Sequence, residues 1–106
     1  MMKLKIGKTT YKVIPVDTLE PTTSRGRIHY PPENRIEIAQ RSGKRPRPRG
    51  GMGMHHTLWH ELIHGVLFEM GSRKYRDENF VDELATHIAS LQLQLMKHYE
   101  CPKPKQ

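Results

Sequence analysis

Hydrophobic and polar residues alternate in two stretches of the first forty positions of the chain, which is the pattern of half-buried strands. The alternation over 3–16 is interrupted by a turn sequence at 7–10, which predicts a hairpin. A second alternation lies on both sides of the turn sequence 31–34 and predicts another hairpin over 27–38. The pattern therefore predicts a small N-terminal antiparallel sheet.

The second half of the chain changes to a helical spacing of apolar residues. They recur every three or four positions from Leu58 to Met70, and Gly71 then provides a helix stop. The same spacing continues from Val81 to Leu95 and predicts a second helix. A sheet followed by two helices is an α+β arrangement.

A basic segment, 41–53, separates the two halves and holds prolines and glycines but no acidic residue. Such a composition buries little apolar surface, so we expect a mobile basic loop. The last residues, 101–106, have the composition of a disordered tail. A chain of 106 residues fits one domain. We therefore expect a single domain over 1–100.

Charge and cysteine content indicate which partners and which compartment suit the protein. The formal net charge is +7, so an acidic partner or nucleic acid could bind through the basic segment 41–53. No apolar run reaches the roughly 20 residues that a membrane span requires, and no signal peptide is apparent. A single cysteine, Cys101, permits no internal disulfide and agrees with a reducing compartment. We expect a cytoplasmic protein without a membrane partner.

The clearest chemical signal is His60-Glu61-Leu62-Ile63-His64, a His-Glu-x-x-His motif inside the first predicted helix. Residues four apart share a helix face, so both imidazoles can bind one tetrahedral ion. Zinc lowers the pKa of a bound water from about 15.7 to about 7, which lets a neighbouring carboxylate take its proton. The motif therefore predicts a Zn²⁺ centre with His60 and His64 as ligands and Glu61 as the catalytic base.

The third ligand distinguishes the classes of zinc peptidase. Metzincins require Gly and His where this chain has Leu67 and Met70, so that class is excluded. Gluzincins take a glutamate from a following helix. Glu78 continues the edge of the second helix face that packs on the first helix, and it is the predicted third ligand.

Three further carboxylates lie near Glu78 in the sequence. Asp82 follows it by one helical turn and could accept the free ring N–H of a ligand histidine. Glu83 points away from the apolar face, and Asp77 fits the position of a helix N-cap. Glu83 and Asp77 remain alternatives for the third ligand.

These two motifs resemble those of the ImmA/IrrE-type metallopeptidases and of related small zincin-like proteins common in phages and prophages. In this chain they read His-Glu-Leu-Ile-His over 60–64 and Glu-Asn-Phe-Val-Asp-Glu-Leu-Ala over 78–85, and the resemblance covers 54–95. It implies a minimal zincin-like domain of the gluzincin kind that cleaves a protein or peptide. The residue roles it implies are zinc ligands at His60, His64 and Glu78, a base at Glu61, and support of a ligand histidine by Asp82.

Three functions fit this sequence. The first is a zinc metallopeptidase whose substrate pairs with an exposed strand, predicted at 35–39. The second is a metal-dependent nuclease or nucleic-acid-associated hydrolase, favoured by the positive charge. The third is a non-catalytic zinc-stabilised binding module, against which Glu61 argues because a structural metal needs no base. Candidate donors to a transition state are Tyr30, Tyr75 and His87.

Overall fold

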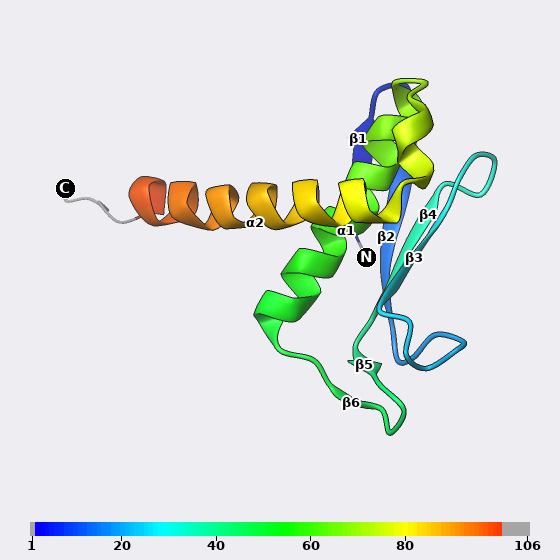
Figure 1. The fold of residues 1–106 in the computed structure, drawn as a ribbon, viewed down its shortest axis with the longest axis vertical. Coiled ribbons are helices and arrows are strands. Elements are labelled where there is room, and N and C mark those ends of the chain that lie inside the picture. The colour runs from blue at the N-terminus through cyan, green and yellow to red at the C-terminus, as the bar shows by residue number, and fades with distance from the viewer. Residues whose placement is uncertain (1, 101–106) are drawn as a thin grey trace.

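A four-stranded sheet is followed by two helices, the first of which packs on the sheet, in the computed structural model, which describes residues 2–100 and the side chains of 2–98 (Figure 1). Cys101 and the predicted tail 101–106 lie outside the described residues. Among the described residues, no helix is long and apolar enough to cross a membrane. The elements are β1 Met2–Ile6, β2 Thr9–Val16, β3 Gly26–His29, β4 Arg35–Ala39, β5 Arg41–Ser42, β6 Arg47–Pro48, α1 Gly51–Glu69, η1 Arg73–Arg76 and α2 Glu78–Glu100.

The sheet has the strand order β1-β2-β4-β3 and is mixed. Both predicted hairpins are present, because β1 pairs with β2 and β3 pairs with β4 in antiparallel fashion. The central pair, β2 and β4, is parallel. The α+β class is confirmed, whereas the prediction of a wholly antiparallel sheet was wrong. The connection 17–25 carries the chain past the position of β4, so β4 returns between β2 and β3.

The strand order also changes which strand can accept a substrate. β4, residues 35–39, has a partner strand on both edges, so the prediction that it is exposed for pairing was wrong. The edge strands of this sheet are β1 and β3. Of these, β3 has the larger contact with α1.

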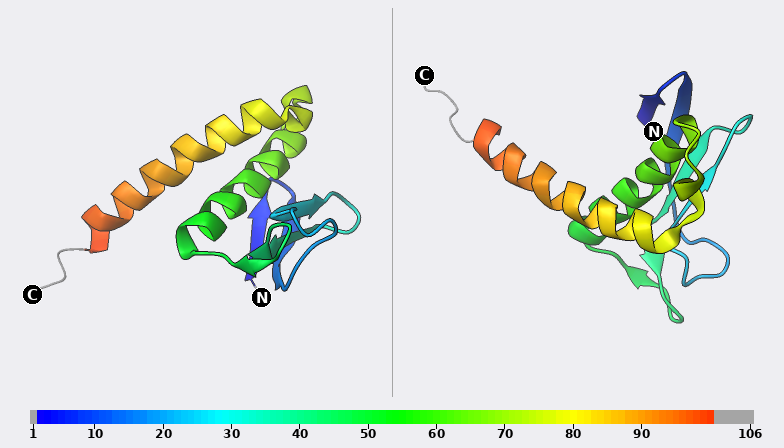
Figure 2. Two further views of the ribbon diagram at one scale, coloured as in Figure 1. Left: turned by 60° about the horizontal axis from the view of Figure 1, so that its bottom comes forward. Right: turned by 45° about the horizontal axis from the view of Figure 1, so that its top comes forward.

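Alternate residues of the sheet point to α1 and form the first core cluster. Its buried members are Tyr11, Val13, Ile36, Ile38 and Leu62. A second cluster joins α1 to α2 through Ile63, Leu67, Val81 and Ala85. Both helices lie on one side of the sheet, and α2 extends well beyond it (Figure 2). The two clusters fix α1 between the sheet and the first half of α2.

The helix boundaries agree with the sequence pattern. α1 ends at Glu69, and Gly71 follows with a φ of 74°, a conformation that glycine adopts without strain. Asp77 precedes α2, and its Oδ1 accepts a hydrogen bond of 3.0 Å from the backbone N–H of Phe80. This is the N-cap geometry that the sequence predicted for Asp77.

The basic segment 41–53 is more regular than its composition indicates. It contains the short hairpin of β5 and β6 and the first residues of α1, so the prediction of a loop over the whole segment was wrong. Arg49 explains part of this order. Its guanidinium donates to the carbonyl oxygens of Ala39 at 2.9 Å, Arg25 at 3.1 Å and Gly53 at 2.9 Å, and to the hydroxyl of Thr57.

Replacing Arg49 by alanine should therefore destabilise the fold. The change removes the donor to the carbonyl oxygen of Ala39 and to the hydroxyl of Thr57, which are buried residues, and each unsatisfied buried polar group costs about 1–3 kcal/mol. For a domain of this size we expect the melting temperature, followed by circular dichroism, to fall by roughly 4–8 °C per kcal/mol. Arg45→Ala is the matched control, because Arg45 is exposed in the same segment. Equal melting temperatures for the two variants would contradict a structural role for Arg49.

Candidate metal centre

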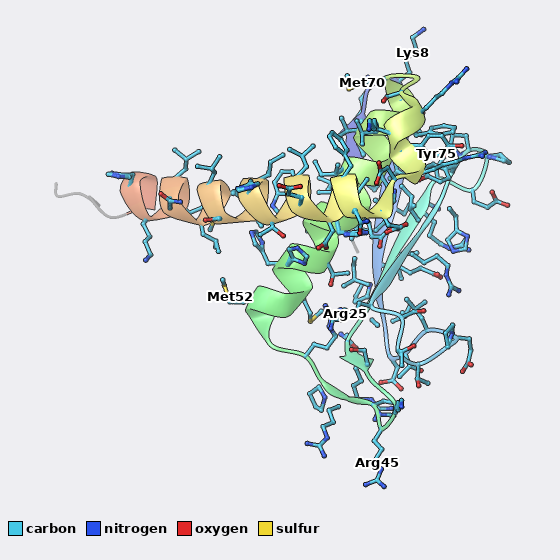
Figure 3. The ribbon with its side chains drawn as sticks, in the orientation of Figure 1. Lys8, Arg25, Arg45, Met52, Met70 and Tyr75 are labelled. Carbon is cyan, nitrogen blue, oxygen red and sulfur yellow. The ribbon has the colours of Figure 1, made fainter. Side chains whose placement is uncertain are left out.

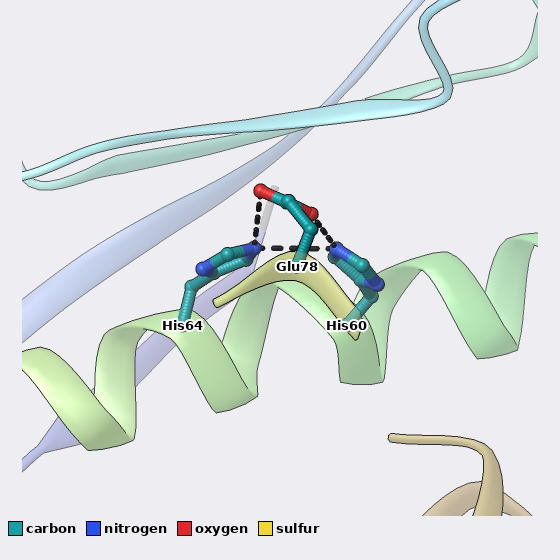
Figure 4. A group of neighbouring side chains, drawn as sticks. All are labelled: His60, His64 and Glu78. Carbon is teal, nitrogen blue, oxygen red and sulfur yellow. Dashed lines mark hydrogen bonds and ion pairs between the residues drawn. The ribbon is translucent and has the colours of Figure 1, made fainter. Parts of the chain in front are cut away.

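Three side chains from two helices converge at one point (Figure 4). His60 and His64 project from the same face of α1, and Glu78 is the first residue of α2. The two Nε2 atoms lie 3.2 Å apart. Glu78 places one carboxylate oxygen 3.0 Å from Nε2 of His60 and the other 3.3 Å from Nε2 of His64. The structure thus brings together the three predicted ligands in a group that could hold a metal ion.

The remaining ring nitrogens show which atoms of the histidines carry protons. Nδ1 of His64 lies 2.7 Å from the backbone oxygen of Tyr75, and a carbonyl oxygen only accepts hydrogen bonds. Nδ1 of His64 is therefore the donor. Nδ1 of His60 lies 3.2 Å from a carboxylate oxygen of Asp82, which also accepts when ionised. In neutral imidazoles this leaves lone pairs on both Nε2 atoms, which face each other and the Glu78 carboxylate.

The distances within the group suit a tetrahedral ion. Ligand atoms with metal bonds of about 2.0–2.1 Å at tetrahedral angles lie about 3.3 Å apart. The separations of 3.0, 3.2 and 3.3 Å are close to that value. Three electron-pair donors at such distances repel each other, so a cation between them would stabilise the arrangement. The donor set of two imidazoles and one carboxylate fits zinc among other metals.

Asp82 and His56 extend the group along the two helices. Asp82 contacts Nδ1 of His60, and His56 places its Nε2 3.6 Å from the same carboxylate and 3.0 Å from the hydroxyl of Thr86. Asp82 lies where a carboxylate would fix the tautomer and orientation of His60. His56, near the start of α1, belongs to this hydrogen-bonded network.

The other two carboxylates lie apart from the group. Asp77 caps α2, as described above, and its other oxygen lies 3.7 Å from the ammonium of Lys74. Glu83 is exposed on α2. Neither belongs to the group of potential metal ligands among the described residues. The structure therefore favours Glu78 over both alternatives.

Glu61 lies next to His60 and is buried, with 7% of its surface exposed. Burial raises the pKa of its carboxyl group, while the neighbouring His60 and His64 act in the opposite direction. The same helix turn carries the buried Thr57, and both side chains lie against Gly26 of β3. Glu61 is thus enclosed between α1 and the sheet edge, beside the possible metal ligands.

Gly26 permits this close approach of β3 to α1. A Cβ atom at this position would lie 2.7 Å from Cγ2 of Thr57 and 3.0 Å from Oε2 of Glu61. No pattern in the sequence indicates this role, because Gly26 falls in a stretch whose composition is that of a loop. The contact depends on α1, which begins twenty-five residues later.

Gly26→Ala should therefore disturb the site more than the fold as a whole. We expect the added methyl group to push β3 or Glu61 aside, with a loss of stability of about 1–3 kcal/mol and a weaker metal affinity. Gly51→Ala is the control, because nothing lies within 4 Å of a Cβ atom at Gly51. Isothermal titration with Zn²⁺ and thermal melting measure the two effects. A Gly26→Ala protein with the metal affinity of the wild type would show that the contact has no bearing on the site.

The group opens into a cleft of about 820 Å³ between β3 and the helices. Tyr30 and Tyr75 line it, whereas His87 does not, so two of the three candidate donors lie at the cleft. Arg25 and Arg27 of the β3 region and Arg76 of η1 also line it, and sequence reasoning singled out none of them. Figure 3 labels Arg25, just before β3, and Tyr75, in η1, which both line the cleft. The cleft thus brings imidazole, carboxylate, phenol and guanidinium groups to one place.

Comparison with protein-family models, with curated proteins and with solved structures gave no match. The function is therefore inferred from the residues of the site and from their geometry.

Proposed function

We propose that this protein is a zinc-dependent metallopeptidase of the gluzincin kind. The observation that carries the proposal is the convergence of His60, His64 and Glu78 beside the buried carboxylate of Glu61. A structural metal site requires ligands but no adjacent base. The resemblance of the two motifs to ImmA/IrrE-type and phage zincin-like peptidases supports the same activity.

In this proposal each residue of the site has a separate task. His60, His64 and Glu78 hold Zn²⁺, which when bound acidifies water and polarises a carbonyl group. Asp82 and the backbone oxygen of Tyr75 accept the Nδ1 protons and keep both Nε2 atoms free. Glu61 takes a proton from the attacking water and passes it to the leaving amine.

The edge of β3 is the proposed place for the substrate backbone. β3 pairs only with β4 among the described strands, so its other edge can accept an extended peptide. Residues 25–28 also line the cleft that contains the candidate metal ligands. A peptide paired with β3 would therefore pass the metal group, and Tyr30 or Tyr75 could donate a hydrogen bond to its carbonyl group.

A metal-dependent nuclease is the second candidate, because the net charge is +7 and arginines line the cleft. Purified protein loaded with Zn²⁺ separates the two activities when it is incubated with unfolded casein and with single-stranded RNA. We expect cleavage of casein that stops on chelation and returns with Zn²⁺. Chelator-sensitive cleavage of RNA without casein cleavage would support the nuclease instead.

A further inference from the structure

The sheet face that points away from the helices carries a row of basic side chains across all four strands. In the strand register Lys3 lies opposite Lys12, Lys12 beside Arg35, and Arg35 opposite His29. Opposed residues point to the same face, and neighbouring strands lie about 4.8 Å apart. The adjacent register row points to the helices and consists of Met2, Val13, Ile36 and Ile28.

Two more basic residues belong to the same face. Lys5 lies two residues from Lys3 on β1, and Arg27 lies two residues from His29 on β3. The carboxylate in these rows is that of Glu37, which lies 3.0 Å from Nε2 of His29 and 3.3 Å from Nε of Arg35. Among the described residues of this face, the positive charges therefore clearly outnumber the negative ones.

This arrangement is unfavourable for the isolated protein. Like charges directly opposite each other in a sheet destabilise it. Lys3 and Lys12 form such a pair, and both side chains are exposed. In the described part of the chain, the ion pairs found on this face involve Glu37, which contacts neither lysine. An anion bound along the row would offset the repulsion.

The chemistry of the face favours nucleic acid over an acidic protein. Protein interfaces have an apolar core, usually with aromatic anchors. The described residues of these rows offer one half-buried apolar side chain, Ile14, and no Phe, Tyr or Trp. Lysine and arginine side chains, in contrast, are sufficient to bind phosphate groups. Without Phe, Tyr or Trp the face offers few groups on which bases can stack, apart from His29 and the arginines.

We propose that this face, defined by Lys3, Lys5, Lys12, Arg27, His29 and Arg35, binds the phosphate backbone of nucleic acid without sequence preference. The surface lies apart from the cleft except at Arg27, which is on the edge strand β3 and also lines the cleft. It is also distinct from the basic segment 41–53. A bound strand would thus leave the cleft accessible to another molecule.

Fluorescence anisotropy with a labelled single-stranded DNA 20-mer of mixed sequence tests the proposal. The comparison is between Lys3→Glu/Lys12→Glu and the control Arg73→Glu/Lys97→Glu, which changes exposed residues of η1 and α2 by the same charge. We expect the sheet variant to raise Kd at least tenfold at about 0.1 M salt, where distant charges are screened. The negative slope of log Kobs against log salt should become shallower by about 1.4, because two phosphate contacts are lost. The control should change Kd less than threefold.

Several results would overturn the proposal. They are absence of binding by the wild type, equal losses in both double variants, or equal affinity of the wild type for polyglutamate. A loss in Arg45→Glu/Arg47→Glu but none in the sheet variant would assign binding to the segment 41–53. If the sheet variant does not fold, as judged by circular dichroism, Lys3→Gln/Lys12→Gln replaces it, with Arg73→Gln/Lys97→Gln as control. We then expect the same tenfold rise of Kd in the sheet variant and a change of less than threefold in its control.

Discussion

Glu61→Gln should retain metal and fold but lose peptide turnover by roughly 10²–10⁴-fold, the usual contribution of a general acid–base group. Glutamine has the shape of glutamate and cannot take a proton from water. Because Glu61 is buried against Gly26 and Thr57, a substitution of equal shape is needed to keep β3 in place. Turnover of unfolded casein, zinc content and melting temperature should be measured on the same preparation.

The matched control for this prediction is Glu69→Gln. Glu69 lies at the end of the same helix and contacts the hydroxyl of Tyr11 at 3.3 Å, away from the metal group. We expect this variant to keep the turnover of the wild type. A Glu61→Gln protein with full zinc content and unchanged turnover would contradict the proposed base and leave the residue without a catalytic task.

The sequence predicted those parts of the structure that depend on local pattern. Alternation identified the strands, and the helical spacing identified α1 and α2. The helical spacing also predicted that Glu78 faces α1. This prediction holds because the cluster that contains Ile63 and Val81 fixes how the two helices face each other. The structure groups Glu78 with His60 and His64 for this reason.

The features that sequence reasoning missed depend on contacts between distant segments. Alternation is the same in parallel and antiparallel pairs, so it could not show that β4 enters between β2 and β3. Composition predicted a loop at 41–53, but Arg49 is held by acceptors from three other parts of the chain. Gly26 likewise gains its role only when α1 packs on β3.

The row of basic residues on the outer face was not apparent from the sequence for the same reason. Lys3, Lys12, Arg35 and His29 come from four strands, and only the register places them side by side. The basic segment 41–53 was the evident candidate because its charges lie close together in the sequence. A row across a sheet has no such signature, since neighbours in the row are separated by up to twenty-three residues along the chain.

Glu78 distinguishes a gluzincin-like site with three ligands from a site of two histidines. Glu78→Ala should weaken Zn²⁺ binding by more than about 100-fold, because loss of groups that merely support a ligand already costs 10–100-fold. Glu83→Ala is the matched control, since Glu83 is exposed on the same helix and lies outside the group. Isothermal titration and zinc content of the purified variants measure the difference.

Metal binding should also appear as stability, because a ligand that binds only the folded state raises its free energy of unfolding. With free Zn²⁺ at about 1,000 times Kd the gain is about 4 kcal/mol, enough to raise the melting temperature by more than about 10 °C in a small domain. Wild type and Glu83→Ala should lose this increment on chelation, and Glu78→Ala should lack it from the start. Full zinc occupancy in Glu78→Ala together with loss in Glu83→Ala would show that the metal binds in another arrangement, because the carboxylate that lies between His60 and His64 would then not be a ligand.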